Sequence, residues 1–379
     1  MTTHDNARQW GEPLWQSRAL MGEARPIPPV IDVAIVGGGL TGMSAAFHLA
    51  RGGLTVVVLE AARVGDGASG RTGGIVLEGT ATGIRSGADD CVPSLARLVD
   101  ELDINCDLHL PGCWEIEHQL GDGDLALPWT DEGHPIRIAR TVAGGSVEPR
   151  ALLFGLAHAA QQSGVVIREH TTVRRIIPHG LAVEVADGVI AAAHVVVAVN
   201  AWVSALLPGL PRIHSALTYA CATEPLSDDI LRELSLGAHI PFYTADRPYL
   251  WGRVARHGEI VFGAGLQYRT PPELERSGVG SGSSQAILQT LSRRVRRLNP
   301  ALARVRIESE WAGPIAFSDQ ALPLIGVYPP NPAILVAAAY AGHGVAFSVH
   351  AGALIADAIL HDAALPEWGA IAKEQPFGS

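Results

Sequence analysis

The chain has 379 residues, of which 47% are hydrophobic and 17% charged, and its formal net charge is −10 at pH 7. This length suits two closely connected domains, and the apolar composition excludes a disordered protein. The acidic balance argues against nucleic acid or an anionic membrane surface as a partner.

Three uncharged stretches approach the length of a membrane span, namely 33–50, 188–211 and 333–356. Each contains glycines or prolines inside a strand–turn–helix pattern, so we interpret them as buried core and expect no membrane contact. The first thirty residues are polar and lack the apolar segment of a signal peptide. We expect their tryptophans, Trp10 and Trp15, to pack onto the body of the protein.

The cysteines and histidines do not indicate a metal site. The 4 cysteines and 15 histidines show no C-x-x-C or H-E-x-x-H spacing, so we expect no bound metal. Reduced thiols are typical of a cytoplasmic protein, and a Cys106–Cys113 disulfide stays open as an alternative.

The clearest pattern is a strand, a glycine turn, a helix and a second strand, which end in the acid Glu60. The turn reads G-x-G-x-x-G, with its glycines at Gly37, Gly39 and Gly42. These glycines allow a tight turn, close approach of a pyrophosphate and close helix packing, and the helix N-terminus favours the phosphates. Glu60 stands where a carboxylate accepts the hydroxyls of an adenosine ribose. The pattern predicts a dinucleotide without saying which one. The first strand, the helix and the second strand are predicted over residues 33–36, 41–51 and 55–59.

A glycine-rich segment follows, with five glycines between Gly65 and Gly74. Such a segment suits backbone that wraps closely around a ligand, and a flexible surface loop is the alternative. Arg71, in its middle, is well placed for a phosphate or an electron-rich ring.

The rest of the chain alternates between two patterns. A second α/β unit begins near residue 146 and ends in the strand 194–199, and a third unit has a strand at 334–339 and a helix at 345–360. Alternating strands from residue 217 onward predict an antiparallel sheet with one exposed face. We expect a proline-rich turn at 323–332. A helix at 286–298 is expected to carry a solvated face formed by Arg293, Arg294, Arg296 and Arg297.

These patterns predict an α/β protein, α+β overall, with a Rossmann-like nucleotide-binding domain built from three chain segments and an inserted antiparallel substrate domain. An N-terminal arm and a C-terminal tail flank the two domains. The arm covers 1–30, the first domain 31–85, 145–215 and 310–365, the second domain 86–144 and 216–309, and the tail 366–379.

Four sequence matches in this order resemble the D-amino-acid-oxidase-like (DAO) superfamily of FAD enzymes, over about residues 30–360. The resemblance lies with its glycine and sarcosine oxidases, and most closely with gamma-glutamylputrescine oxidase-like amine oxidases. It implies FAD as the cofactor. The matches are VAIVGGGLTG with VVVLE, GASGRTGG, VVVAVNAW, and WAGPIAFSDQALPLIG with AYAGHGVAFS.

The resemblance also implies which residues hold FAD. The glycine turn holds the pyrophosphate, Glu60 the ribose and Val173 the adenine, while the glycine loop lies along the flavin and the Gly342–Val345 segment meets its pyrimidine end. A helix that begins at Gly344 points its positive end at the negative charge of a reduced flavin. The expected cofactor residues are Gly37, Gly39, Leu40, Thr41, Gly42, Glu60, Ala61, Arg63, Ser69, Gly70, Arg71, Thr72, Gly73, Gly74, Val173, Asn200, Ala201, Trp202, Gly342, His343, Gly344 and Val345.

The chain departs from the family pattern where substrate binds. The arginine that clamps a substrate carboxylate in amino-acid oxidases is replaced by Ile315, which favours an unclamped amine or a clamp by Arg253. The flavin-linking cysteine of sarcosine oxidase corresponds to Ala312, so we expect non-covalent FAD. The lysine that assists oxygen there corresponds to Val261. We expect the pocket to be lined by Tyr249, Trp251, Arg253, Tyr340, His343 and Phe347.

We therefore predict a cytoplasmic FAD-dependent oxidoreductase that oxidises the C–N bond of an amine or amino acid by hydride transfer to flavin N5. The imine product hydrolyses, and O2 or another acceptor reoxidises the flavin. A dehydrogenase or biosynthetic tailoring enzyme on the same fold, and a non-catalytic flavoprotein subunit, are the alternatives. The oligomeric state stays open.

Overall fold

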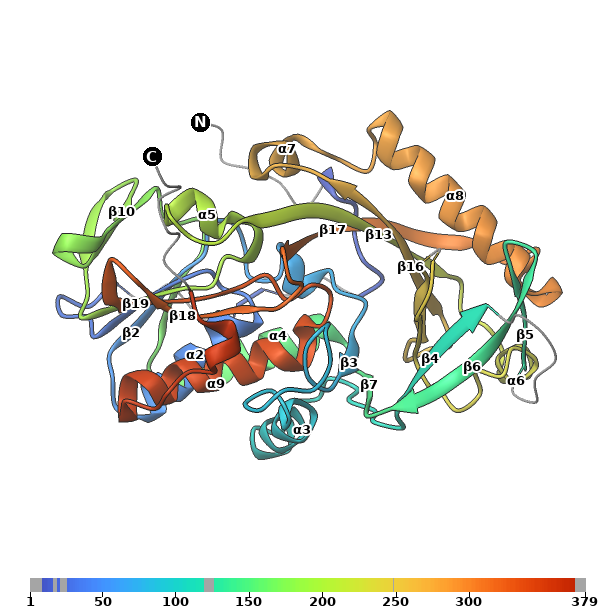
Figure 1. Cartoon of the computed structure of the whole chain (residues 1–379), viewed down its shortest axis with the longest axis horizontal. Helices are drawn as coiled ribbons and strands as arrows, with labels where there is room; N and C mark the ends of the chain where they lie inside the picture. Colours follow the sequence, from blue (N-terminus) through green and yellow to red (C-terminus); the bar gives the residue numbers. More distant parts are fainter. Residues whose placement is uncertain (1–8, 16–18, 21–25, 119–125, 248, 372–379) are drawn as a thin grey trace, which may run out of the picture.

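The computed structural model describes residues 9–15, 19–20, 26–118, 126–247 and 249–371. The chain forms two bodies, one with helices packed on a mainly parallel sheet and one built on a large antiparallel sheet (Figure 1). Most of the predicted N-terminal arm, and the tail from residue 372 with Lys373, lie outside the described residues.

The first body contains a six-stranded sheet in the order β18-β19-β12-β1-β2-β8. Strands β19, β12, β1, β2 and β8 run parallel, and β18 pairs antiparallel with β19 at the edge. The apolar runs that predicted β1 and β2 are buried throughout, as expected of strands covered on both faces. The bounds are β1 Val33–Val36, β2 Val56–Leu59, β8 Val166–Arg168, β12 His194–Val197, β18 Leu324–Tyr328 and β19 Asn331–Ala338.

The turn expected at 323–332 is confined to Pro329 and Pro330, because the rest of this segment contains β18 and the start of β19. Its prolines stand at the ends of the strands, where a missing N–H does not interrupt the pairing. Leu324 and Ile325 between them are buried against the core. The apolar residues therefore decided the structure here.

Helices α2, α3, α4 and α9 share one core with one face of this sheet. Helix α3 packs on α9, and its Leu95 and Leu98 belong to the same core, so α3 belongs with the first body and not with the substrate domain to which 86–144 was assigned. By length and composition α9 could cross a membrane, but half of that stretch is buried inside the protein, where α9 packs on α2. The bounds are α2 Leu40–Arg51, α3 Cys91–Glu101, α4 Pro149–Gln162 and α9 Gly344–His361.

The opposite face of the parallel sheet is covered by a second core that includes a small three-stranded sheet. This sheet, over residues 175–191, lies within the second α/β unit, just before β12. The short helix α5 closes the same face. The bounds are β9 Arg175–Ile177, β10 Ala182–Val185, β11 Gly188–Ala191 and α5 Val203–Leu206.

The second body is an eight-stranded sheet in the order β17-β13-β16-β15-β14-β4-β6-β5. All its neighbouring strands are antiparallel except β14 and β4. Because β17 pairs with β13 along its length, the predicted domain boundary at 310 falls inside a strand of this sheet. The bounds are β4 Cys113–His118, β5 Ala126–Asp131, β6 His134–Val142, β13 Ile213–Thr223, β14 Phe242–Thr244, β15 Trp251–Val254, β16 Ile260–Tyr268 and β17 Ile307–Ser318.

Helix α8 packs along one face of this sheet, with α6 and α7 at its ends (Figure 1). The strand pair β3 and β7 lies between the two bodies. The bounds are α6 Asp228–Glu233, α7 Pro271–Arg276, α8 Gly282–Leu298, β3 Ile75–Leu77 and β7 Gly144–Ser146.

The N-terminal tryptophans pack onto the body, as the sequence predicted. Trp10 and Trp15 are 2% and 6% exposed. The indole N–H of Trp15 donates to the Gly70 carbonyl at 2.7 Å, and the Trp10 carbonyl accepts from the N–H of Ala312 at 2.7 Å. Residues 9–15 therefore connect the glycine-rich loop of the first body to β17 of the second.

Candidate functional site

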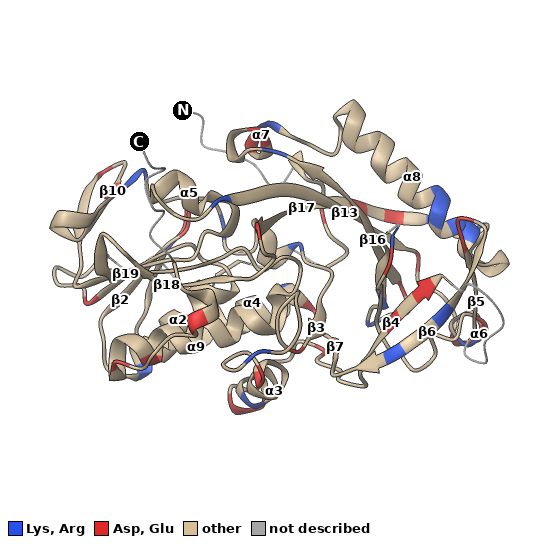
Figure 2. Ribbon diagram, in the orientation of Figure 1, with Lys and Arg blue, Asp and Glu red and all other residues tan. Residues whose placement is uncertain are grey.

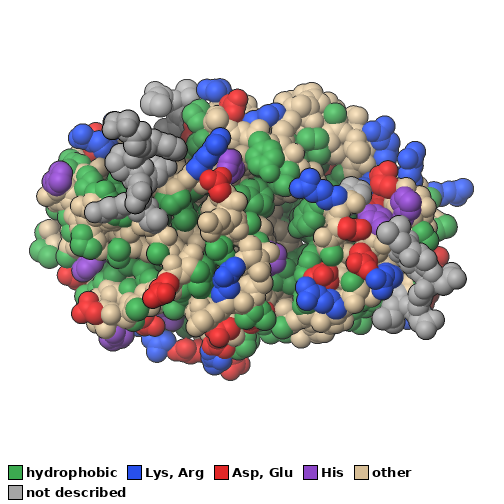
Figure 3. All heavy atoms as spheres, in the orientation of Figure 1, with side chains coloured by type: hydrophobic (Ala, Val, Ile, Leu, Met, Phe, Trp, Pro, Cys, Tyr) green, Lys and Arg blue, Asp and Glu red, His purple; other side chains and the backbone are tan. Residues whose placement is uncertain are grey.

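A cavity of about 1610 Å³ lies between the two bodies. In Figure 3 the surface is hollowed near the middle of the molecule, with hydrophobic side chains at the edge of the hollow. The cavity is lined by Gly39, Leu40 and Thr41 at the start of α2 and by the segment Gly342–Val345 at the start of α9. The N-termini of two helices, more than 300 residues apart in the sequence, therefore border the same cavity.

The glycine turn requires glycine at two positions. A Cβ on Gly42 would lie 2.0 Å from the carbonyl oxygen of Gly37. Gly37 has φ +106°, and a Cβ there would lie 2.6 Å from the Ala198 carbonyl oxygen. Only residues without a side chain fit this approach of α2 to the sheet. The turn therefore has the close packing that the motif predicted.

Glu60 lies beside this turn and does not itself line the cavity. Its Oε2 accepts from the Gly38 N–H at 2.8 Å, and its Oε1 accepts from the Ala62 N–H at 2.9 Å. Burial raises the pKa of Glu60, and these two N–H groups partly offset the shift. A carboxylate held next to the phosphate-binding turn fits the predicted ribose role, which stays a prediction.

The glycine-rich loop is a packed segment, not a flexible surface loop. The Ser69 hydroxyl accepts from the N–H of Leu40 at 3.0 Å, which ties the loop to the start of α2. A Cβ on Gly73 would lie 2.1 Å from the ring of Trp251. Ser69, Thr72 and Gly73 line the cavity, so this loop can lie along a planar ligand.

Arg71 lines the cavity and Trp202 does not, and the cofactor contact expected of each stays a prediction. The Arg71 guanidinium donates to the carbonyls of Asp66 at 2.9 Å and Gly11 at 2.6 Å, and lies 5.6 Å from the ring centre of Trp10. Trp202 packs 6.3 Å from Trp10 and is not among the residues that line the cavity. Arg71 and Trp202 both pack against the N-terminal segment. No sequence pattern predicted that this segment lies beside the glycine-rich loop.

The start of α9 joins the start of α2 through a tyrosine. The ring of Tyr340 packs on Phe347, and its hydroxyl is 2.7 Å from the Thr41 hydroxyl. Burial keeps the pKa of Tyr340 well above its ordinary value. His343 is the N-cap residue of α9, and its N–H donates to the Tyr340 carbonyl at 3.0 Å. The partial positive charge of the helix therefore points into the cavity.

His343 should make the protein less stable in mild acid. Burial lowers the pKa of His343 below 6.5, with the Ala341 backbone partly opposing the shift. As pH falls through 6.5 the unfolded chain takes up this proton and the folded chain does not, so stability falls until the lowered pKa is reached. Chemical unfolding of wild type and His343→Gln at several pH values checks this. We expect the variant to lose less stability, and an equal loss would contradict the assignment.

Four of the six residues predicted for the substrate pocket line the cavity: Tyr249, Trp251, Tyr340 and His343. Arg253 does not, because it is 2% exposed and donates to the carbonyls of Gly73 at 2.5 Å and Val254 at 3.4 Å. Its role as a carboxylate clamp is therefore wrong; it supports the glycine-rich loop from behind. Phe347 is fully buried beneath Tyr340 and is part of the core.

Sequence analysis missed a polar group at the opposite wall of the cavity. Glu115 Oε2 accepts from the Tyr243 hydroxyl at 2.8 Å and from Arg140 at 2.8 Å, and all three residues line the cavity. The ring of Tyr243 lies 6.5 Å from that of His343. Figure 2 shows acidic residues on β4 and basic residues on β6. The parallel contact between β14 and β4, over a hundred residues apart, brings these side chains together.

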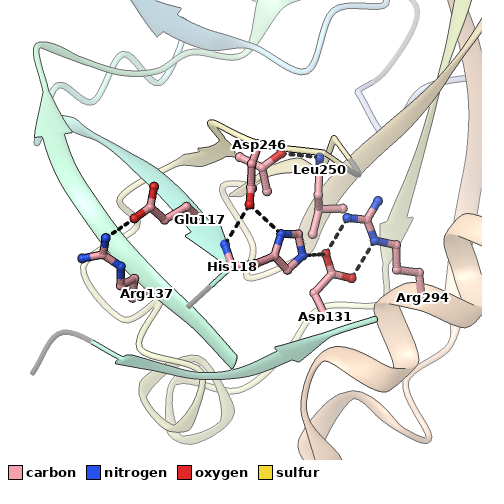
Figure 4. Close-up of polar contacts among 8 residues, drawn as sticks. Glu117, His118, Asp131, Arg137, Asp246, Leu250 and Arg294 are labelled. Carbon is pink, nitrogen blue, oxygen red and sulfur yellow. Dashed lines mark hydrogen bonds and ion pairs between the residues drawn. The ribbon is translucent and has the colours of Figure 1, made fainter. Parts of the chain in front are cut away.

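A buried charge network fixes the loop between β14 and β15 beside this wall (Figure 4). Asp131 accepts from Arg294 at 2.5 and 2.7 Å, and His118 bridges Asp131 at 3.1 Å and Asp246 at 2.9 Å. Arg294 also donates to the Tyr249 carbonyl at 2.8 Å. The expectation of a fully solvated arginine face on α8 is therefore wrong for Arg294, which is 9% exposed.

The other predicted cofactor residues occupy varied places. Asn200 lines the cavity and accepts the Ala339 N–H at 2.9 Å, and Ala201 next to it is buried. Val173 is buried in the core on the other face of the sheet. Arg63 is half exposed and lies 3.5 Å from Asp66, and Ala61 is exposed. Cofactor contacts at these positions stay predictions.

Within the described ranges, no group of three histidines, cysteines or acids could hold a metal ion. The four cysteines are free and buried, so the structure contains no Cys106–Cys113 disulfide. Burial raises the pKa of Cys91 and Cys113 to about 12 and of Cys106 to about 11. None of the four lines the cavity.

The fold and the cavity define a class of protein. A parallel-sheet domain with a dinucleotide turn faces an antiparallel-sheet domain across a cavity. Gly37 and Gly42 let α2 pack closely on the sheet, and Gly39 and Gly73 line the cavity, where their backbone is open to a flat, phosphate-bearing cofactor. This arrangement fits FAD.

The family is shown by comparison with known proteins. The family model described as FAD dependent oxidoreductase (DAO) matches residues 32–358, and the chain belongs to this family. Gamma-glutamylputrescine oxidoreductase of Escherichia coli is 31% identical over 381 residues, covering 88% of this chain and 84% of that protein. Glycine oxidase of Bacillus licheniformis is 26% identical over 372 residues, covering 89% and 95%.

The fold agrees with solved structures of this family. The crystal structure of glycine oxidase from Geobacillus kaustophilus matches with a TM-score of 0.72 at 20% identity, and it covers 91% of this chain and 99% of that one. The predicted family, fold class and cofactor are therefore confirmed.

Proposed function

We propose that this protein oxidises the carbon–nitrogen bond of an amine or amino acid to an imine, which then hydrolyses. The observation that carries the proposal is the single cavity that joins the starts of α2 and α9 to one face of the antiparallel sheet. When bound, FAD supplies the chemistry by accepting a hydride from the substrate carbon and passing the electrons to an acceptor. The relatives named above, an amine oxidoreductase and a glycine oxidase, support the reaction class.

The residues of the chain then have separate tasks. The backbone at Gly37–Gly42 and the start of α2 would hold the phosphates, and Glu60 the ribose. The start of α9 would stabilise negative charge on the flavin ring without reorganising. Trp251, wedged between Gly73 and Gly263, gives the ring a rigid neighbour.

The wall opposite α9 offers a place for the substrate amine. Hydrogen bonding from Arg140 holds the pKa of Glu115 below its ordinary value, so Glu115 is ionised. Burial and Glu115 raise the pKa of Tyr243, so its hydroxyl stays protonated and donates to that carboxylate. The ionised carboxylate of Glu115 beside the ring of Tyr243 favours a cationic amine.

The substrate does not need an α-carboxylate. Ile315 of β17 lines the cavity where amino-acid oxidases carry the clamping arginine, and Arg253 is turned away from it. Arg247, on the loop between β14 and β15, is exposed and lines the cavity, so it is available to a carboxylate at the side of the cavity away from Ile315. Comparing each amino acid with its decarboxylated amine tests the preference.

We infer that FAD is held without a covalent bond and that the enzyme is cytoplasmic. Ala312, at the position of a flavin-linking cysteine, is buried, and no cysteine lines the cavity. Four buried free thiols suit a reducing compartment. Denaturant should release unmodified FAD into the filtrate; flavin that stays with the precipitated protein would contradict non-covalent binding.

Transfer to an acceptor other than oxygen is the second candidate. No lysine occurs among the described residues, Val261 replaces the lysine that assists oxygen, and burial keeps His343 uncharged near neutral pH. Oxygen reduction benefits from a fixed positive charge near the flavin, so these features favour slow reaction with O2 unless an arginine that lines the cavity, such as Arg71, supplies that charge. Peroxide formed in step with substrate loss indicates an oxidase, whereas turnover that requires an added acceptor indicates a dehydrogenase.

Tyr243→Phe should lower kcat/KM for amines by about tenfold, chiefly through KM, because Glu115 loses the hydroxyl that orients its carboxylate toward the amine, a positioning effect of about 1.4 kcal/mol. The control is Tyr328→Phe, which removes a hydroxyl that donates to the Pro208 carbonyl at 2.7 Å outside the cavity. Steady-state kinetics of both variants with amines measure the effect. Equal kcat/KM values for the two variants would show that Tyr243 is not part of the substrate site.

The proposed function is tested by mixing the yellow protein with amines and amino acids without oxygen and recording flavin absorbance. Bleaching by an amine supports the proposal and dismisses a non-catalytic flavoprotein subunit. A panel of primary and secondary amines that leaves the flavin oxidised, in a protein that dithionite reduces, would overturn it.

A further inference from the structure

Exposed apolar side chains are concentrated at the cavity. Eight large hydrophobic side chains are exposed among the described residues, and four of them line the cavity: Ile84, Tyr249, Leu266 and Tyr268. Their exposed fractions are 64%, 43%, 43% and 63%. We call these four residues the apolar rim. Single exposed hydrophobics are ordinary, but a group around one opening marks a binding surface.

A β-bulge turns two of these side chains toward the cavity. The pairing of β13 with β16 shifts register at Thr218 and Tyr219, opposite Gly265, which has φ +80°. After the bulge the Tyr219 hydroxyl, which contacts Ser284 of α8 at 2.9 Å, donates to Gln267 at 2.8 Å. Gln267 therefore points to the α8 side.

Because side chains alternate along a strand, Leu266 and Tyr268 point to the opposite face, which is the cavity side. Without the extra residue they would be directed to the α8 side. The local geometry of β16 thus exposes two apolar residues that continuous pairing would bury. Bulges commonly re-aim side chains beside active sites.

The apolar surface continues from the rim into the cavity. Ile287 of α8, with Ile315 and Phe317 of β17, also lines it. Four charged lining side chains are grouped toward the other side of the sheet: Glu115 on β4, Arg140 on β6, and Asp246 and Arg247 on the loop between β14 and β15 that also carries Tyr249 of the rim. Arg71, Glu78 and Arg294 line the cavity elsewhere. A ligand in this space would meet most of the charged groups at the β4–β6 side and an apolar surface at the β16–β17 side.

We propose that the apolar rim binds an apolar substituent of the substrate, so that the enzyme prefers amines with a long alkyl or aryl group over small zwitterionic amino acids. This inference rests on the proposed function and names its substrate class. The rim is continuous with the cavity and with its apolar lining, which favours a substituent of the bound molecule over a separate partner.

Binding can be measured without turnover. Amines whose nitrogen-bearing carbon has no hydrogen cannot transfer hydride, and a series of 2-methylalkan-2-amines of increasing chain length provides such ligands. We expect calorimetric Kd values on the FAD-loaded protein to fall about threefold for each added methylene that reaches the rim. The same order of preference is expected in kcat/KM for the corresponding linear primary amines.

The rim is tested with Leu266→Ser/Tyr268→Ser and with Tyr268→Ser alone, both at exposed positions. The control is Val189→Ser, 60% exposed on β11 and outside the cavity lining. In the double variant the gain in affinity should fall to below about 1.5-fold per added methylene. The single variant should lose part of this gain, and the control should keep the wild-type gain.

The two proposals fail differently. Amines that bleach the flavin but gain nothing from chain length, or a double variant with the wild-type gain, would overturn the rim and leave the proposed function standing. A protein whose flavin no amine bleaches would overturn the proposed function and, with it, the substrate class.

Discussion

Gly42→Ala should yield a protein that is purified almost without FAD. The added Cβ would stand 2.0 Å from the carbonyl oxygen of Gly37, whose N–H donates to Leu59 of β2, while α2 fixes the Cα of residue 42. Relief requires α2 to move away from the turn, which removes the close approach of its N-terminus to the phosphates. A loss of about 3 kcal/mol in FAD binding lowers affinity about a hundredfold.

Gly67→Ala is the matched control, because a Cβ there meets nothing within 4 Å. Gly67 lies in the same glycine-rich region and has φ −84°, which alanine adopts readily. Flavin content per protein and titration of the apoprotein with FAD measure the effect. A Gly42→Ala protein with the FAD affinity of the control would show that the turn does not contact the cofactor.

Trp15→Ala should both destabilise the protein and weaken FAD binding, although Trp15 does not line the cavity. The indole is 6% exposed, donates to the Gly70 carbonyl at 2.7 Å, and packs on Trp311 at 5.4 Å. Replacing a buried tryptophan by alanine costs about 3–5 kcal/mol. Part of that loss falls on the glycine-rich loop, since Gly70 precedes the cavity-lining residues 71–73.

Trp15→Phe separates the two contributions. Phenylalanine keeps most of the packing but removes the N–H donor, so we expect a loss of about 1 kcal/mol. Unfolding with and without excess FAD measures both effects. If FAD stabilises Trp15→Ala as much as it stabilises wild type, residues 9–15 support the fold without supporting the cofactor loop.

Local patterns predicted the parts of the molecule that are built from neighbouring residues. The strand, turn and helix around Gly37–Gly42 are specified within one stretch, because each glycine meets atoms of the same unit or of the adjoining strand. The helix that begins at Gly344 is likewise local, and its dipole predicted its orientation toward the cavity.

Contacts between distant segments were not predictable in this way. Arg253 looked like a cavity residue because Trp251, two positions before it, is one, but its guanidinium reaches the Gly73 carbonyl instead. The basic end of α8 looked solvated because Asp131, the partner of Arg294, comes from a strand 163 residues earlier. Glu115 and Tyr243 meet only because β4 and β14 are neighbours in the sheet.

The central claim is that one FAD occupies the cavity from the start of α2 to the start of α9. A crystal structure of the protein loaded with FAD tests it most directly. We predict one continuous cofactor with its phosphates at Gly37–Gly42 and its ring system beside Gly342–Val345. Cofactor density that begins at the glycine turn but leads away from His343, or lies outside this cavity, would contradict the account.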